Sequence, residues 1–415
     1  MSLALGLRCV NCEKEYPLKI LYNCPNCGGI LDVFYDKLRG KAGNEKRLIV
    51  DESIQGLWTY REYLPVLNKE NICSLIEGKT PLIRSKIDFD SFIAEELFFK
   101  DETRNPSGSF KDRPTTVAIS KAIENGIQGV ITASSGNAGT ATAAYAAVAS
   151  LPSIILVPEK VPKEKLMQMF VYGSKIIKVK GDYSNSFNLA KEIAVKCDYA
   201  NLTSTYYNPY GLEGDKTIAY ELFDQLKGLV PKYILVPIGT GPLLTGIYKG
   251  YKELKKLGFI NKLPRMIGVQ AMGCAPIVKA YNEKRNKVEP WDLVDTIASG
   301  ISDPLKGYSQ DGTYTLKTIK NSNGCAISVS DEEILKSVLV LGKQQGLYVE
   351  PTSASVIIAY EKLRKMNIIR ERDLTVSIIT GIGFKDTKPL MDSLNSIPLI
   401  EPTFDKFKEI EMLWG

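Results

Sequence analysis

Short runs of hydrophobic residues alternate with longer amphipathic stretches along most of the chain. The short runs predict strands at residues 97–100, 130–133, 154–157, 176–179, 233–238, 266–270 and 375–380. The stretches between them predict helices at residues 115–124, 138–149, 186–195, 217–226 and 244–257. Because strands and helices that alternate in this way form βαβ units, we expect parallel sheets with helices on both faces.

One further helix has recognisable signals at both ends. Ser330 and Glu333 have the spacing of a capping box, in which each side chain bonds to a backbone amide at the helix start. Apolar residues follow at helical spacing from Ile334 to Leu341, and Gly346 is a suitable stop. The pattern predicts a helix that begins just after Ser330.

Length and composition limit the class of protein. A chain of 415 residues exceeds a typical single domain, so two or three units are expected. No apolar run approaches the ~18 residues that cross a bilayer, and the N-terminal sequence MSLALGLRCV lacks the basic start of a signal peptide. The net charge of +6 is not gathered into a basic patch. We expect a cytoplasmic protein with no membrane or nucleic-acid partner.

Histidine is absent from the chain. Its absence excludes Ser-His-Asp and Cys-His catalysis, histidine-ligated metals and an imidazole general base. If the protein is an enzyme, its proton transfers must use lysine, carboxylate, tyrosine, a cofactor or the substrate.

Four of the eight cysteines lie close together near the N-terminus. They form two C-x-x-C pairs, Cys9 with Cys12 and Cys24 with Cys27, joined by a spacer long enough for a small hairpin. Four thiolates arranged in this way fit a tetrahedral zinc ion. Two disulfides are the alternative, which a cytosolic setting disfavours. We expect a structural zinc ribbon at residues 1–40.

Three predicted strands end in loops that contain glycine and hydroxyl side chains. The loops include Ser134-Ser135-Gly136-Asn137, Gly239-Thr240-Gly241-Pro242-Leu243 and Thr380-Gly381. In parallel α/β folds, ligands bind at the carboxyl ends of the strands, where loop amides and helix N-termini meet. The first loop suits a carboxylate, the second suits a phosphate, and Thr380 can meet a ring nitrogen. Each loop alone could be a tight turn, but three together favour a binding site.

Lys111 follows a bend rich in serine and glycine and stands beside Phe110 at the start of a predicted helix. A positive helix end and an apolar neighbour both lower the pKa of a lysine, which supplies the free amine that a Schiff-base nucleophile needs. A solvated surface lysine is the alternative that this segment alone leaves open.

Six segments occur together in a recognisable order. They are FKDETRNPSGSFKDR (99–113), SSGNAG (134–139), NPYGLEGDKT (208–217), VPIGTGPLLTG (236–246), EPTSAS (350–355) and TGIGFKD (380–386). Jointly they resemble the threonine synthase family within the fold-type II pyridoxal-phosphate enzymes, some of whose members also have an N-terminal four-cysteine ribbon.

The resemblance implies a cofactor and a role for each loop. Pyridoxal 5'-phosphate would be linked to Lys111 and bonded at its ring oxygen by Asn137. Thr380 would face its ring nitrogen. The remaining implied residues are Ser134, Ser135 and Gly136 for the substrate carboxylate, and Gly239, Thr240, Gly241 and Leu243 for the cofactor phosphate.

The same resemblance implies two doubly wound parallel sheets in two lobes, similar to the β subunit of tryptophan synthase, plus the small zinc ribbon. Residues 41–115 and 205–415 would form a large cofactor-binding domain, and residues 116–204 would form a smaller mobile one. A small amino acid would be the substrate, and the protein would be a homodimer.

The implied activity is that of a lyase that makes threonine and phosphate from O-phosphohomoserine and water. Several positions depart from the family pattern: Gly211 replaces a common arginine, Pro242 removes an amide donor, and Ile382 replaces a histidine. Arg104, Arg113, Lys163 or Lys216 could compensate for the missing arginine. The alternatives are a threonine or serine dehydratase, a β-replacement synthase similar to cysteate synthase, and a non-catalytic binding protein.

Overall fold

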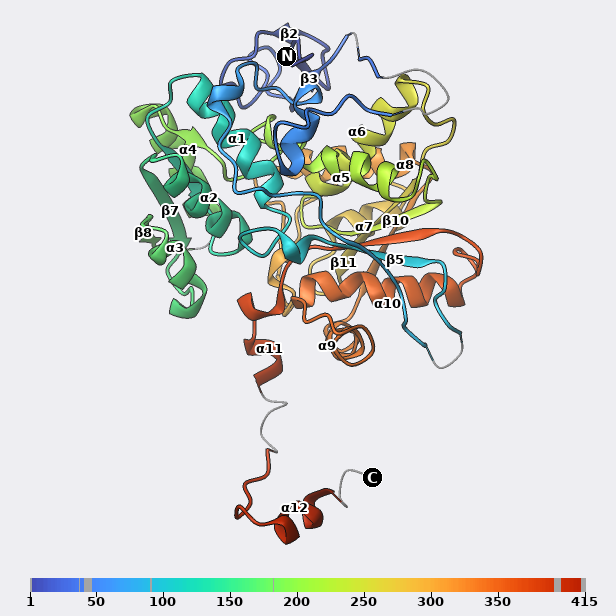
Figure 1. Cartoon of the computed structure of the whole chain (residues 1–415). Coiled ribbons are helices and arrows are strands. Elements are labelled where there is room, and N and C mark those ends of the chain that lie inside the picture. Colours follow the sequence, from blue (N-terminus) through green and yellow to red (C-terminus); the bar gives the residue numbers. More distant parts are fainter. Residues whose placement is uncertain are drawn as a thin grey trace.

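Two mainly parallel sheets form the body of the protein, and a small antiparallel sheet lies at its N-terminal end (Figure 1). The computed structural model describes residues 2–36, 38–40, 47–89, 92–181, 183–391 and 397–411. Among these residues, none of the helices has both the length and the apolar content needed to cross a bilayer.

The larger sheet has six strands. Its spatial order is β12 (Cys325–Val329), β11 (Arg265–Ala271), β10 (Tyr233–Pro237), β13 (Thr375–Ile379), β5 (Leu97–Asp101) and β4 (Leu82–Arg84). Neighbouring strands are parallel except for β4, which runs antiparallel to β5 at the edge. Every residue of β10 and β13 is buried, as expected where helices cover both faces of a sheet.

The smaller sheet has four parallel strands. They are ordered β8 (Lys175–Val179), β7 (Ser153–Pro158), β6 (Val130–Ala133) and β9 (Ala200–Asn201).

Twelve α-helices are present in the described part of the chain. They are α1 (Asp112–Glu124), α2 (Asn137–Val148), α3 (Met167–Val171), α4 (Tyr183–Cys197), α5 (Gly211–Gln225), α6 (Pro242–Lys256), α7 (Pro276–Asn282), α8 (Ser309–Asn321), α9 (Asp331–Val340), α10 (Pro351–Lys365), α11 (Lys388–Met391) and α12 (Phe404–Glu411). The 3-10 helices are η1 (Gly56–Tyr63), η2 (Lys69–Asn71), η3 (Glu102–Arg104), η4 (Lys163–Leu166), η5 (Ser299–Ile301) and η7 (Gly383–Lys385). A π-helical segment, η6, spans Leu341–Gln345.

Alternation along β10 shows how the large sheet is covered. Ile234 and Val236 belong to the hydrophobic cluster that includes α5 and α6, whereas Tyr233 and Leu235 belong to the cluster that includes α9 and α10. Figure 1 shows α5 and α6 on one side of this sheet and α10 on the other. The side-chain period of two therefore buries both faces.

The elements predicted from the hydrophobic pattern are confirmed; most of their ends move by up to three residues, and α5 begins six residues before the predicted start at residue 217. The capping box is also confirmed, because the Ser330 side chain accepts from the Glu333 amide and the Glu333 side chain accepts from the Ser330 amide. The helix continues through the π turn η6 and stops at Gly346, whose φ is +68°. The predictions did not include strands β4, β9 and β12 or helices α3, α7, α8, α10, α11 and α12.

The N-terminal sheet packs on helices α5 and α6 through buried and partly buried charged side chains. It is ordered β2 (Glu15–Tyr16), β1 (Gly6–Cys9) and β3 (Leu31–Phe34), and both pairings are antiparallel. Lys249 on α6 donates to Asp32 at 2.5 Å and to Glu213 on α5 at 2.6 Å. The Tyr35 hydroxyl also donates to Glu213, at 2.6 Å. The small sheet is thus anchored on the helices α5 and α6.

Candidate active site

A tight bend before α1 fixes the position of Lys111. The carboxylate of Asp112 accepts from the Ser107 amide at 2.7 Å and from the Ser107 hydroxyl. Gly108 has a φ of +81°, a conformation that glycine adopts at little cost. The Phe110 amide donates to the Thr380 carbonyl at 2.9 Å, so the bend is held against the carboxyl end of β13.

Lys111 itself is partly buried at the start of α1. Within the described part of the chain no hydrogen bond or ion pair holds its Nζ, which lies 4.7 Å from the centroid of the Phe110 ring. Burial lowers the pKa of Lys111, while the carboxyl groups of Asp215 and Asp303 act in the opposite direction. An amine in this setting can be neutral and reactive, as the sequence indicated.

Thr380 lies directly after β13 and is buried. Its hydroxyl is 2.8 Å from the hydroxyl of Ser353 on α10. The Ser353 hydroxyl also accepts from the amides of Thr380 at 3.0 Å and of Gly381 at 2.8 Å. Thr380 therefore presents an oriented, neutral hydroxyl.

Asn137, at the start of α2, is held between two charged side chains. Its Nδ2 donates to the two carboxylate oxygens of Glu350 at 3.1 and 2.9 Å, and its Oδ1 accepts from Lys385 at 2.9 Å. Burial raises the pKa of Glu350 to about 7. A Cβ at Gly381 would lie 2.3 Å from the Glu350 carboxylate, so a larger residue there would displace that carboxylate from Asn137. The three side chains join α2 to the start of α10 and to η7.

The loop between β10 and α6 brings bare backbone to the site. Gly241 has a φ of +96°, and a Cβ there would lie 2.3 Å from Cγ2 of Thr315. The Thr315 hydroxyl donates to the Thr240 carbonyl at 2.5 Å, which fixes the loop. Pro242 is at the first turn of α6, and the Leu243 side chain is buried in the core. Only the backbone of Leu243 is therefore available to a ligand.

The loop between β6 and α2 is open. Ser134 and Ser135 are partly buried, Gly136 is exposed, and a Cβ at Gly136 would meet no atom within 4 Å. The Gly136 amide donates to the Ser134 hydroxyl at 3.3 Å. This turn stands directly before Asn137 at the start of α2.

These loops converge at the carboxyl ends of the strands. The bend before Lys111 contacts Thr380, and Asn137 binds Glu350, whose carboxylate lies beside Gly381. A Cβ at Gly239 would lie 3.3 Å from Cβ of Asp303. The carboxyl group of Asp303 in turn influences the pKa of Lys111. This is the end at which parallel α/β folds bind ligands.

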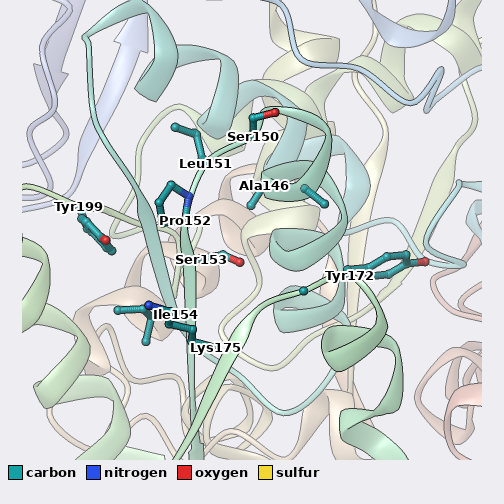
Figure 2. A pocket seen from close by; sticks show the side chains of 11 residues that line it. Ala146, Ser150, Leu151, Pro152, Ser153, Ile154, Tyr172, Lys175 and Tyr199 are labelled. Carbon is teal, nitrogen blue, oxygen red and sulfur yellow. The ribbon is translucent and has the colours of Figure 1, made fainter.

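Two surface cavities lie at the opposite ends of the strands. The first, of about 280 Å³, is lined by residues such as Leu151, Ile154 and Tyr172 at the amino ends of β7 and β8 (Figure 2). The second, of about 1090 Å³, includes Lys232 and Arg265 at the amino ends of β10 and β11. Neither includes Lys111, Asn137 or Thr380, so neither is the candidate active site.

Two of the cations that could replace the missing arginine are fully occupied. Arg113 is buried and pairs with Glu102 and Glu221, each at 2.6 Å. Lys216 is buried and pairs with Glu213 at 2.7 Å and Glu253 at 3.1 Å. Both side chains stabilise the fold and are not free to hold a substrate phosphate.

The position of Gly211 itself is crowded. Gly211 is the first residue of α5, and a Cβ there would lie 3.1 Å from Cγ2 of Thr205 and 3.2 Å from Cβ of Pro114. Arginine at residue 211 would therefore disturb the contact between α1 and α5.

Comparison with known proteins decides the family. Residues 73–381 match the family described as pyridoxal-phosphate dependent enzyme. The chain belongs to this family. It is 40% identical to a threonine synthase of Methanocaldococcus jannaschii over 91% of this chain and 92% of that protein. It is 36% identical to a threonine synthase of Methanosarcina acetivorans over 97% of this chain and 98% of that protein.

Solved structures agree on the fold. Maize serine racemase superposes with a TM-score of 0.64 at 22% identity, over 81% of this chain and 94% of that one. The processed threonine deaminase isoform 2 of Solanum lycopersicum superposes with a TM-score of 0.61 at 19% identity, over 92% of this chain and 99% of that one. The expected two-sheet fold of a fold-type II pyridoxal-phosphate enzyme is confirmed.

The residues at the site fit the cofactor of this family. Lys111 offers an unpaired amine, the Gly241 loop offers backbone and a helix N-terminus for a phosphate, and Thr380 offers a fixed hydroxyl. The sequence indicated all three.

Four other side chains near this site were not assigned a role from the sequence. They are Asp215, Asp303, Glu350 and Lys385. Asp215, Glu350 and Lys385 stand inside the segments that resemble the family, which is the one signal that could have indicated them.

The four N-terminal cysteines come together as the spacing predicts. Their sulfur atoms all lie within 4.8 Å of one another, and those of Cys9 and Cys27, and of Cys12 and Cys24, are 3.5 Å apart. Zn–S bonds of about 2.3 Å in a tetrahedral site place sulfurs about 3.8 Å apart. The cluster therefore fits a zinc ion.

Proposed function

We propose that this chain is a threonine synthase, which converts O-phosphohomoserine and water to threonine and phosphate. The observation that carries the proposal is the similarity to threonine synthases of 36–40% identity along almost the whole of both chains. A site with an uncommitted lysine amine supports it, because no histidine is available to move protons.

We assign the site residues as follows. Lys111 anchors the cofactor and Thr380 faces its ring nitrogen. Asn137 donates to its ring oxygen in exchange for one of the two bonds from its Nδ2 to the Glu350 carboxylate. Backbone amides hold its phosphate, and the turn before α2 holds the substrate carboxylate; these residues are Gly239, Thr240, Gly241 and Leu243 for the phosphate, and Ser134, Ser135 and Gly136 for the carboxylate.

When bound, pyridoxal phosphate supplies the electron withdrawal that makes carbon-bound protons of the substrate acidic. The protein must then move those protons. The amine of Lys111 is placed to take the proton from the α-carbon and to return it, since its pKa is lowered by burial. The neutral hydroxyl of Thr380 beside a ring nitrogen favours elimination and replacement over reactions that need a fully protonated ring.

A second activity is supported by the state of the cations that could bind a substrate phosphate. Gly211 offers no side chain, and Arg113 and Lys216 are engaged in buried ion pairs. Because a buried phosphate needs charge-assisted donors, a dehydratase or β-replacement activity on a smaller amino acid is the alternative reaction.

One assay separates the two activities. The purified protein with pyridoxal phosphate is incubated with O-phosphohomoserine, threonine or serine, and threonine, phosphate and ammonia are measured separately. A threonine synthase releases threonine and phosphate in equal amounts from O-phosphohomoserine, and Lys111→Ala abolishes both. Ammonia release from threonine or serine, without threonine formation from O-phosphohomoserine, would establish the dehydratase instead.

We further propose that one structural zinc ion binds Cys9, Cys12, Cys24 and Cys27. The mutual distances of the four sulfurs support this assignment. About 40 residues bury too little apolar surface to fold unaided, so the metal stabilises the ribbon.

We also propose that the protein acts as a cytoplasmic homodimer on a small amino-acid substrate, without a nucleic-acid or membrane partner. Residues 116–204 would move as a smaller domain against a large domain of residues 41–115 and 205–415. The separation of the strands into two sheets supports this division. Sedimentation tests the dimer, and small-angle scattering with and without substrate tests the motion.

A further inference from the structure

Asp215 is a buried carboxyl group without a partner. It lies on α5 and is 0% exposed, and neither of its oxygens has a hydrogen bond within the described residues. A buried polar group left in this state costs several kcal/mol, because it has lost the water that would otherwise solvate it. Such a residue is expected to meet another group during function.

The surroundings of Asp215 leave one available cation. The charged groups that influence it are Lys111 and Arg113 from α1 and Glu102 from η3. Arg113 is already bonded to Glu102 and Glu221. On the α6 side stands Gly246, where a Cβ would lie 2.6 Å from Cβ of Asp215, so α6 packs closely against this residue. Of the two cations that influence Asp215, Lys111 is the one without a partner of its own among the described residues.

We propose that Asp215 is the proton-holding partner of Lys111, and that the two side chains share one proton. While Nζ of Lys111 is covalently engaged, the proton is on the Asp215 carboxyl. When the amine is released, the proton moves between the two groups: as the O–H bond of Asp215 breaks, an N–H bond forms on Lys111, and the reverse transfer restores the neutral amine that takes the α-carbon proton. The proposal rests on the proposed function only in taking Lys111 as the reacting amine.

The electrostatic setting supports this exchange. Burial raises the pKa of Asp215 to about 8 and lowers the pKa of Lys111, while each group favours the charged form of the other. The proton affinities of Asp215 and Lys111 are therefore closer than those of the same groups in water, and moving the proton between them costs less free energy. A neutral Asp215 also adds no negative charge to a site that must accept a phosphorylated substrate.

Asp303 provides the comparison. It also influences Lys111, but its Oδ1 accepts from the Leu305 amide at 2.9 Å and from the Tyr308 hydroxyl at 2.8 Å. Because these bonds stabilise it independently of Lys111, Asp303 is less suited to exchange a proton. Asp215 acts through Lys111 and is therefore a positioning residue.

The test measures the titration of Lys111 in the cofactor-free protein. The rate of acetylation of Lys111 by acetic anhydride is followed by peptide mass spectrometry from pH 6 to pH 10 in wild type, Asp215→Asn and the control Asp303→Asn. Removing a partner carboxylate typically lowers a lysine pKa by about one unit or more. We expect Lys111 to react roughly tenfold faster at pH 7 in Asp215→Asn, with a smaller change in Asp303→Asn.

An unchanged Lys111 profile in Asp215→Asn would overturn the proposal, as would an equal or larger change in Asp303→Asn. If Asp215→Asn does not fold, Lys111→Met gives a second test, since Asp215 should then keep its proton to higher pH. The infrared carbonyl band of protonated carboxyl groups would persist to higher pH than in wild type, and a band with the same midpoint would contradict the pairing. Neither measurement uses a substrate, so both can be interpreted even if the protein does not form threonine. A failure of the proposed function is thereby distinguished from a failure of the pairing of Asp215 with Lys111.

Discussion

Replacing Arg113 by methionine should destabilise the protein strongly. The guanidinium is fully buried and donates to both oxygens of Glu102, at 2.6 and 2.8 Å, and to both oxygens of Glu221, at 2.6 and 2.8 Å. Lys100 also donates to Glu221 at 2.6 Å. Without Arg113, the carboxylate of Glu102 loses its cation inside the protein.

The expected magnitude follows from the burial of the pair. Removing one partner of a buried ion pair typically costs about 3–5 kcal/mol, because the other charge stays buried and unpaired. Arg84 provides the control, since it pairs with Glu96 at 3.3 Å and its side chain is 59% exposed. Exposed pairs contribute about 0–1 kcal/mol, so Arg84→Met should change the free energy of unfolding by no more than that.

Urea unfolding, followed by circular dichroism, measures both variants. Adding Glu102→Gln to Arg113→Met should recover part of the loss, because it removes the unpaired charge. The reasoning is refuted if Arg113→Met unfolds within 1 kcal/mol of Arg84→Met, or if its one effect is a higher KM for O-phosphohomoserine. The second result would make Arg113 a substrate-phosphate ligand.

Three further predictions concern the site and the ribbon. Gly241→Ala should weaken pyridoxal-phosphate binding about tenfold or more in an equilibrium titration, because residue 241 has a φ of +96° and its new Cβ would lie 2.3 Å from Thr315. The control Gly126→Ala, with a φ of +72° and no atom within 4 Å of the new Cβ, should leave binding unchanged. Chelation or Cys24→Ser should release one zinc and lower the unfolding temperature, whereas native protein without zinc and with four alkylatable thiols would exclude the metal site. The pKa of Glu350 rises from 4.5 to about 7 on folding, so its contribution to stability is present below pH 4.5 and is lost as pH rises through 7. Between pH 5 and pH 8, the free energy of unfolding of cofactor-free Glu350→Gln should therefore increase relative to that of wild type by up to about 3 kcal/mol. A difference that stays constant with pH would contradict the shift.

Most of the fold could be predicted from the sequence because its signals are local. Strand β6 was predicted with its observed ends, and the capping box at Ser330 marks the observed start of α9. Strand β12 was missed because Cys325–Val329 is only partly buried at the sheet edge. Helix α10 was missed because small and hydroxyl residues such as Ser353 stand where its buried face would show apolar periodicity.

The site was predictable only in part, for a different reason. Lys111 and Thr380 stand in segments that resemble a family, but the partners of a side chain depend on distant parts of the chain. Nothing local indicates that Glu350 binds Asn137, which is 213 residues away, or that Lys111 influences the pKa of Asp215. The same limit applies to Arg113, because its own segment does not indicate that Glu102 and Glu221 occupy its guanidinium.

Covalent trapping at Lys111 tests the central claim most directly. The protein is incubated with pyridoxal phosphate, reduced with borohydride and digested, and the modified lysine is identified by mass spectrometry. The account predicts one stoichiometric adduct, on Lys111, and its loss in Lys111→Ala. A stoichiometric adduct on another lysine, or no adduct in folded protein saturated with the cofactor, would contradict the assignment of the active site.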